Sequence, residues 1–312
     1  MNVDQKFYSP LKIGLFIVTL AYFLFTFHAM FTLEWIGEWN RIAGTFSLRI
    51  LIEDISASIG MIFRFIGSVL ALATIIYFFI KKSISKPKLY RILRVIIVFE
   101  GIYWLGLITS GATGIYSIAT ALGNRSSTYI FERLFFYVIP AVVESTAIPI
   151  SLFILARKLS PTKPLKAAIK WASISGAFFV LTFWLVNTGI WALTVWGSSV
   201  RAKGIDYLMS FPQNMAGFLI TAVGMLALTI YAAQSARVIK AENLSELNFK
   251  PAGIIILGTG LFFLSNYLIW IFFGGDNVWS DWYAWLLGHN LDLWMLSLPL
   301  VGVPLLFERK AS

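Results

Sequence analysis

Two histidines lie inside otherwise apolar stretches of the chain, and they are the only two in the sequence, His28 and His289. Imidazoles on two separate helices are the ligands that hold a membrane-embedded b-type haem, one on each face of the iron. The other polar groups inside apolar stretches are Arg64, Glu100, Glu144, Asn187, Asn266 and Asp292. Polar groups in hydrocarbon are costly, so those that a sequence retains there are candidates for function.

The amino-acid composition indicates the kind of structure that carries these polar groups. Hydrophobic residues make up 58% of the 312 and charged residues only 13%, against about 25% charged in an ordinary globular chain. Together with a mean hydropathy of +0.79, this excludes a soluble globular protein. The absence of cysteine also excludes disulfides, thiolate metal sites and a thiol nucleophile. The sequence therefore predicts an all-α, polytopic integral membrane bundle.

Eight apolar runs are each long enough to cross a bilayer as a helix. They lie at about 11–33, 60–80, 95–115, 134–156, 171–196, 212–236, 252–273 and 283–307. The segment 43–59 mixes charged and apolar residues with a helical period, so we expect it either to lie flat at the outer interface or to extend the second helix outward. These runs predict a single transmembrane domain over residues 1–312.

In a membrane protein, the net charge of +10 indicates the orientation of the chain in the bilayer and not binding of nucleic acid. Threading the eight runs with both termini on one side places most of the lysines and arginines on that same side. Because basic loops stay in the cytoplasm, we expect cytoplasmic N and C termini and a multi-pass protein of the cell membrane. Its expected partners are membrane lipid and other subunits of a membrane complex on the outer face, with no nucleic acid.

Depth can be counted from the expected outer ends of the helices at about 1.5 Å per residue. On this count His28 and His289 lie about 8 and 9 Å deep, with Arg64 slightly shallower. The side chains slightly deeper, at about 10 to 14 Å, are Asn187, Asn266 and Asp292. We therefore predict a polar pocket open to the outside, with Glu144 near its floor. Glu100, about 9 Å above Arg94, is expected in the inner half and apart from the pocket.

The leading functional hypothesis is a membrane subunit for electron transfer that holds one haem b between His28 and His289 near the outer surface. Arg64 would balance the propionate charge, and Asp292, one turn from His289, would orient its imidazole. Glu144 would accept a proton when quinol, the expected quinone-type partner in the bilayer, is oxidised by an external acceptor.

The prolines around Glu144 support an alternative. Pro140 and Pro149 each remove a backbone donor and free a carbonyl one turn earlier, so the helix is expected to bend or break around the carboxylate. Discontinuous helices of this kind build ion and proton sites in transporters. The alternative is a proton- or ion-coupled transporter or channel for a small solute, whose site comprises Glu100, Glu144, Asn187, Asn266 and Asp292. A third reading is a scaffold subunit whose polar residues only lock helices together.

The eight-helix layout with internal termini is similar to that of haem A synthases and of the quinone-binding membrane subunits of polysulfide-reductase-type complexes. The similarity is one of layout alone. The chain departs from the first family in having two histidines where four haem-binding histidines are expected. No quinone-site motif of the second family aligns with it.

The haem hypothesis makes a spectroscopic prediction. Protein purified from haem-sufficient cells should show a b-type spectrum on dithionite reduction, at one haem per chain in a pyridine haemochrome assay. Because each imidazole supplies one axial ligand, His28→Ala and His289→Ala should each abolish that spectrum. A colourless wild-type protein would eliminate the hypothesis.

Overall fold

The computed structural model describes residues 9–31, 48–81, 84–108, 130, 134, 138–191, 220–240, 248–273 and 294–307. These residues contain helices and turns and no strand, which confirms the predicted all-α class. The helices are α1 (Ser9–Phe31), α3 (Leu48–Lys81), α4 (Lys86–Gly106), α7 (Ile139–Val142), the π-helical turn η2 (Val143–Ala147), α8 (Ile148–Lys158), α9 (Leu165–Trp191), the π-helical turn η4 (Ile220–Met225), α13 (Leu226–Val238), α14 (Lys250–Phe273) and α18 (Pro299–Phe307).

Four helical segments are long and apolar enough to cross a membrane: Pro10–Met30, Ile55–Lys81, Ile139–Lys158 and Leu165–Leu185. Two further apolar helices, Lys250–Ser265 and Trp294–Phe307, are shorter. Large aliphatic side chains such as Ile80 and Ile150 are exposed on the outside of the bundle, as expected where the solvent is lipid. These features support a membrane protein. Eight spans, cytoplasmic termini and the cell membrane stay predictions.

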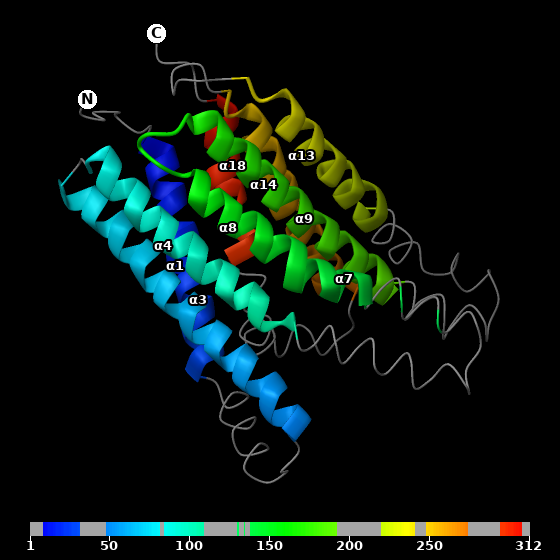
Figure 1. Ribbon diagram of the computed structural model, residues 1–312. Coiled ribbons are helices and arrows are strands. Elements are labelled where there is room, and N and C mark those ends of the chain that lie inside the picture. Colours follow the sequence, from blue (N-terminus) through cyan, green and yellow to red (C-terminus); the bar gives the residue numbers. More distant parts are fainter. Residues whose placement is uncertain are drawn as a thin grey trace.

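The helices pack in chain order, and their contacts close into a ring. α1 packs on α3, α3 on α4, α4 on α8, α8 on α9, α9 on α13, α13 on α14, and α14 on α18, which returns to α1 (Figure 1). Short connections between α3 and α4 and between α8 and α9 make antiparallel hairpins of neighbouring helices. The first and last described helices of the chain are therefore side by side.

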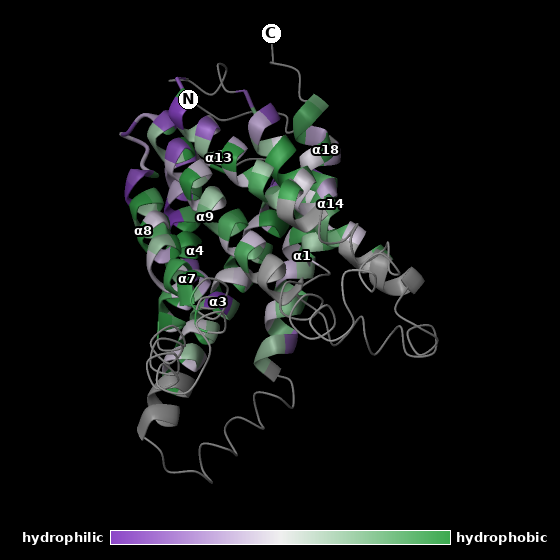
Figure 2. Cartoon of the chain, turned by 90° about the vertical axis from the view of Figure 1, so that its right-hand side faces the viewer, coloured by the Kyte–Doolittle hydropathy of each residue, from purple (hydrophilic) through white to green (hydrophobic). Residues whose placement is uncertain are grey.

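Hydrophilic residues gather at one end of the bundle, where these two hairpins turn (Figure 2). The Arg94 guanidinium donates a hydrogen bond of 2.8 Å to the Leu159 carbonyl, and the Lys163 ammonium donates one of 3.0 Å to the Arg157 carbonyl. Such bonds satisfy carbonyls at and beyond the end of α8. The clustering agrees with the single basic side that the sequence predicts, and it is called the basic end below.

Two helices extend beyond the expected spans. α3 runs without a break from Leu48 to Lys81, so residues 48–59 prolong the second apolar run, the second of the two arrangements expected for 43–59. Residues 43–47 lie outside the described residues. α4 begins at Lys86, ahead of the expected start at 95, because long lysine and arginine side chains reach the interface from within a helix.

Glycines bring helix backbones together at the seams of the ring. A Cβ added to Gly14 of α1 would lie 2.0 Å from the Leu300 carbonyl oxygen of α18. One added to Gly260 of α14 would lie 2.4 Å from the Pro299 ring. In membranes, where lipid is as apolar as leucine, such close approach is a main source of helix association. Two glycines in the apolar run Gly258-Thr259-Gly260 predict a close helix-packing notch, and a Cβ at either position would meet the side chain of Leu228 or Pro299.

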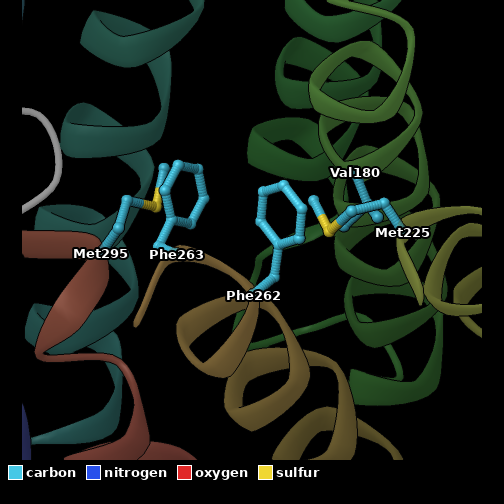
Figure 3. Close-up of a cluster of buried hydrophobic side chains, with 5 residues drawn as sticks. All are labelled: Val180, Met225, Phe262, Phe263 and Met295. Atoms are coloured by element: carbon cyan, nitrogen blue, oxygen red, sulfur yellow. The ribbon is translucent and has the colours of Figure 1, made fainter. Parts of the chain in front are cut away.

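The interior of the ring is aromatic. Val180, Met225, Phe262, Phe263 and Met295 form a buried cluster that joins α9, η4, α14 and the segment before α18 (Figure 3). The Phe183 ring packs edge-on against Phe263, with ring centroids 5.3 Å apart. The cluster therefore joins α9 to the helices of the C-terminal part of the described chain.

The contact between α1 and α18 predicts a steric effect. Gly14→Ala should lower the free energy of unfolding by about 1–3 kcal/mol, because the new methyl group meets a backbone carbonyl that cannot rotate away. Gly176→Ala is the matched control, since a Cβ there meets nothing within 4 Å. Both are measured by SDS-induced unfolding in mixed micelles. Equal stability of the two variants would contradict the packing described here.

Candidate functional site

A stripe of small residues on α3 lets α4 approach closely beside Arg64. A Cβ on Gly60 would lie 3.1 Å from the Tyr103 backbone, and one on Gly106 would lie 2.6 Å from the Ser56 carbonyl oxygen. The Ser56 hydroxyl donates a hydrogen bond of 2.9 Å to the Gly106 carbonyl. Arg64 follows Gly60 by one helical turn, so it faces α4 at the same seam.

Arg64 forms an ion pair with Glu100 across this seam. The guanidinium Nη2 lies 3.2 Å from Oε1 of Glu100, and the Arg64 side chain is only 3% exposed. The Tyr22 hydroxyl of α1 donates a 2.5 Å hydrogen bond to Oε2 and accepts one of 3.0 Å from Arg64 Nε. The Trp104 indole donates a 3.0 Å bond to Oε1. Three helices thus share one closed polar network.

Aromatic rings enclose the Arg64 guanidinium. Its central carbon lies 4.0 Å from the Tyr103 ring centroid, and 5.4 and 5.5 Å from those of Tyr22 and Phe25. A desolvated cation over an aromatic face gains about 2 kcal/mol. The site therefore stabilises the positive charge from two sides, through the Glu100 carboxylate and through the π faces of its walls.

A second polar contact joins α1 to α3 beside this network. The hydroxyls of Thr26 and Ser68 share a 2.6 Å hydrogen bond, and both side chains are fully buried. Because Thr26 lies one turn from Tyr22 and Ser68 one turn from Arg64, the pair fixes the rotation of both helices. The two helices are thereby held in the register that brings the Tyr22 hydroxyl to the ion pair.

The expectation that Glu100 stands apart from the other polar groups is wrong, because it is the partner of Arg64. The error came from the assumed start of the third span at 95. Because α4 begins at Lys86, Glu100 lies about 21 Å from the basic end along its helix. Arg64 lies about 26 Å from Lys81, at the same end of α3, so the two side chains are at similar depths.

Glu144 lies in a widened helical turn. The π-helical turn η2 (Val143–Ala147) separates α7 from α8, in agreement with the interruption expected from Pro140 and Pro149. The Ser145 and Thr146 hydroxyls donate hydrogen bonds of 2.6 and 2.5 Å to the carbonyls of Ala141 and Val142. Single π-helical turns inside helices are frequent at functional sites.

The Glu144 side chain is half-buried, and its turn η2 packs against α4, the helix that carries Glu100. Within the part of the chain that the structure describes, no salt bridge or hydrogen bond engages this carboxylate. Glu144 therefore lies on a turn that packs against α4, but it takes no part in the ion pair of Arg64 and Glu100.

Two more buried polar atoms have no hydrogen-bond partner among the residues that the structure describes, the Thr182 hydroxyl oxygen of α9 and the Trp294 indole nitrogen. The Trp294 ring packs edge-on against Tyr22, with centroids 5.6 Å apart. Counted along α9 from the basic end, Thr182 lies about 26 Å deep, within the range of about 20 to 26 Å found for Tyr22, Arg64, Glu100 and Glu144. Trp294 joins this layer through its contact with Tyr22. The bundle therefore has one polar layer, and only part of it is paired.

The other predicted site residues are not brought together by the described chain. His28 is half-buried in the last turn of α1, about 120° around the helix from Tyr22. Asn187 lies in α9 and Asn266 in α14, but their side chains lie outside the described part. His289 and Asp292 also lie outside it. A haem between His28 and His289 therefore stays a prediction, and Arg64, expected at its propionates, is bound to Glu100.

Sequence reasoning missed Tyr22 and Trp104, which complete the network. Aromatic residues in apolar runs carry little signal by themselves, since most belong to cores and interfaces. The available signal was the spacing of Glu100 and Trp104, because residues four apart lie on one face of a helix.

Comparison of the chain with protein-family models, with curated proteins and with solved structures gives no match. The site must therefore be interpreted from its own geometry.

The ion pair predicts an asymmetric mutational effect. Glu100→Gln should destabilise the protein by about 3–5 kcal/mol, because it leaves the Arg64 charge buried without a counterion. Combining it with Arg64→Gln should recover part of that loss, since no uncompensated charge then remains. SDS-induced unfolding of the two single variants and the double variant gives the coupling free energy. Strict additivity would show that the two groups do not interact.

Proposed function

We propose that the protein is a proton-coupled transporter for a small solute, with Glu144 as the group that gains and loses the coupling proton. The observation that supports it most directly is the Glu144 carboxylate, which lies on a π-helical turn between two prolines and has no salt-bridge or hydrogen-bond partner among the described residues. Intramembrane carboxylates in interrupted helices are typical of proton and ion sites.

The two carboxylates of the polar layer have different environments, which supports different roles. Glu100 is bound by Arg64, Tyr22 and Trp104, so its charge is compensated throughout the proposed transport cycle. Glu144 has no such counterion among the described residues, so its charge changes with the proton it carries. In this proposal Glu100 keeps Arg64 in place, and Glu144 responds to the proton gradient.

The unpaired donors of the layer support a solute site. A buried donor without a partner costs about 1–3 kcal/mol, which a bound polar solute offsets. Within the described part of the chain, the Thr182 hydroxyl and the Trp294 indole N–H are such donors. A small solute with hydrogen-bond acceptors is thus the ligand class that this layer favours.

Electron transfer through haem b stays a second hypothesis, which the spectrum described above tests. It draws no added support from the described residues, because Arg64 has a protein counterion. The scaffold reading shares the same buried network, but a scaffold gains nothing from an unpaired carboxylate in the layer, since its burial is costly.

The transporter proposal predicts a specific change in Glu144→Gln. Wild-type protein in vesicles with an alkaline interior should accumulate at least one solute from a panel of amino acids, sugars and organic ions, measured by mass spectrometry of washed vesicles. A protonophore should abolish the accumulation. Glu144→Gln should lose accumulation but keep exchange of labelled for unlabelled solute, because an amide imitates the protonated carboxyl without releasing a proton.

Glu144→Asp is the control, since it keeps a titratable group on the same turn and should retain part of the uptake. Gradient-driven accumulation in Glu144→Gln equal to that of the wild type would remove Glu144 from coupling. Absence of uptake across the panel, together with loss of assembly in the Glu100 and Glu144 variants, would favour the scaffold.

A further inference from the structure

A groove opens on the bundle between α13 and α14, away from the polar layer. Its volume is about 550 Å³, and its lining is almost wholly apolar. Gly224, Leu228 and Tyr231 line one side, and Ile254, Gly258 and Leu261 line the other. In a membrane bundle such a groove faces hydrocarbon and not water.

Small residues and the π-helical turn make this groove. A Cβ added to Gly224, which lies in η4, would meet nothing within 4 Å. Gly258 lies so close to the Leu228 side chain that its Cβ would approach it to 2.6 Å. The seam is therefore tight near Gly258 and open near Gly224, so a chain in the groove must be slender.

The length of the groove matches one leaflet. From Ile254 to Ser265 the wall of α14 extends about 17 Å along the helix axis. Half of a hydrocarbon core of about 30 Å is about 15 Å. One extended acyl chain of a phospholipid therefore fits the groove from end to end.

A basic residue stands at the end of this groove. Lys250 precedes Ile254 by one helical turn, so it continues the stripe of α14 that lines the wall. It is the first residue of α14 and is exposed, and no ion pair engages it among the described residues. Phe249, the residue before it, packs against the buried cluster that contains Leu11 of α1, and Lys12 of α1 lies over the Phe78 ring near the end of α3, so Lys250 lies at the basic end of the bundle. A lysine at the interface attracts anionic lipid headgroups.

We propose that this groove binds one anionic glycerophospholipid, with an acyl chain between α13 and α14 and the headgroup phosphate at Lys250. The charge of Lys250 selects the headgroup, and the apolar walls select the chain. The bound lipid belongs to the bilayer leaflet at the basic end of the bundle. The site is separate from Glu144, so it stands whether or not the protein is a transporter.

The test compares two lipids that share their acyl chains, phosphatidylglycerol and phosphatidylcholine. Full-length protein is exchanged into nanodiscs of equal amounts of both, released, and analysed by native mass spectrometry. The wild type should retain one lipid per chain and prefer phosphatidylglycerol by about fivefold or more, the effect of one lysine at a membrane surface. Lys250→Gln should bring that preference close to unity while a lipid is still retained.

Gly224→Leu tests the groove itself. The leucine side chain should fill it and abolish retention of the lipid, while Gly176→Leu, whose Cβ also meets nothing within 4 Å, should leave retention unchanged. Equal retention in wild type and Gly224→Leu would overturn the proposal, as would a Lys250→Gln variant with the wild-type preference. A Gly224→Leu variant that changes the oligomeric state would identify a second copy of the chain as the occupant instead.

Discussion

The arrangement of the first three described helices depends on one buried positive charge. Arg64 is 3% exposed in an apolar bundle, and a charge in such a place must be compensated by the protein itself. Glu100 supplies the counterion, Tyr22 and Trp104 complete its hydrogen bonds, and the Tyr103 ring covers the guanidinium. The small residues of α3 follow from this requirement, because without close approach of α4 the pair would not meet. Specific polar contacts of this kind also fix register, which apolar packing alone leaves loosely defined.

The polar layer combines two kinds of group at one depth. Some are fully paired, as Arg64 and Glu100 are, and they hold helices in register. Others lack partners among the described residues, namely Glu144, Thr182 and Trp294. A protein that needed only cohesion would place apolar side chains at these positions, because buried polar atoms without partners are costly. The division between paired and unpaired groups is therefore the physical basis for placing function in this layer.

Several features were predictable from the sequence because they follow from local chemistry. The apolar runs predicted the helical membrane class, the prolines around Glu144 predicted an interrupted helix, and Gly258 and Gly260 predicted close helix packing. The pairing of Arg64 with Glu100 was not predictable, since it depends on where α4 begins and which helix faces α3. Basic residues at Lys86 and Arg94 hid the true start of that helix, because they lower the hydropathy of a segment that is structurally continuous. The π-helical turn η4 had no comparable signal, since its sequence contains no proline.

The closed ring has a consequence for biosynthesis. The seam between Gly14 of α1 and Leu300 of α18 joins two segments far apart in the sequence, so it cannot form until the ribosome has synthesised the chain through Leu300. The charge of Arg64, by contrast, finds its partners within the first hundred or so residues, in Tyr22 and Glu100. The helices α1, α3 and α4 can thus enter the membrane with the Arg64 charge already compensated. Until α18 is inserted, the face of α1 that packs against it is in contact with lipid. Membrane chaperones would bind this exposed face of α1, and in a chain truncated before α18 it would stay exposed.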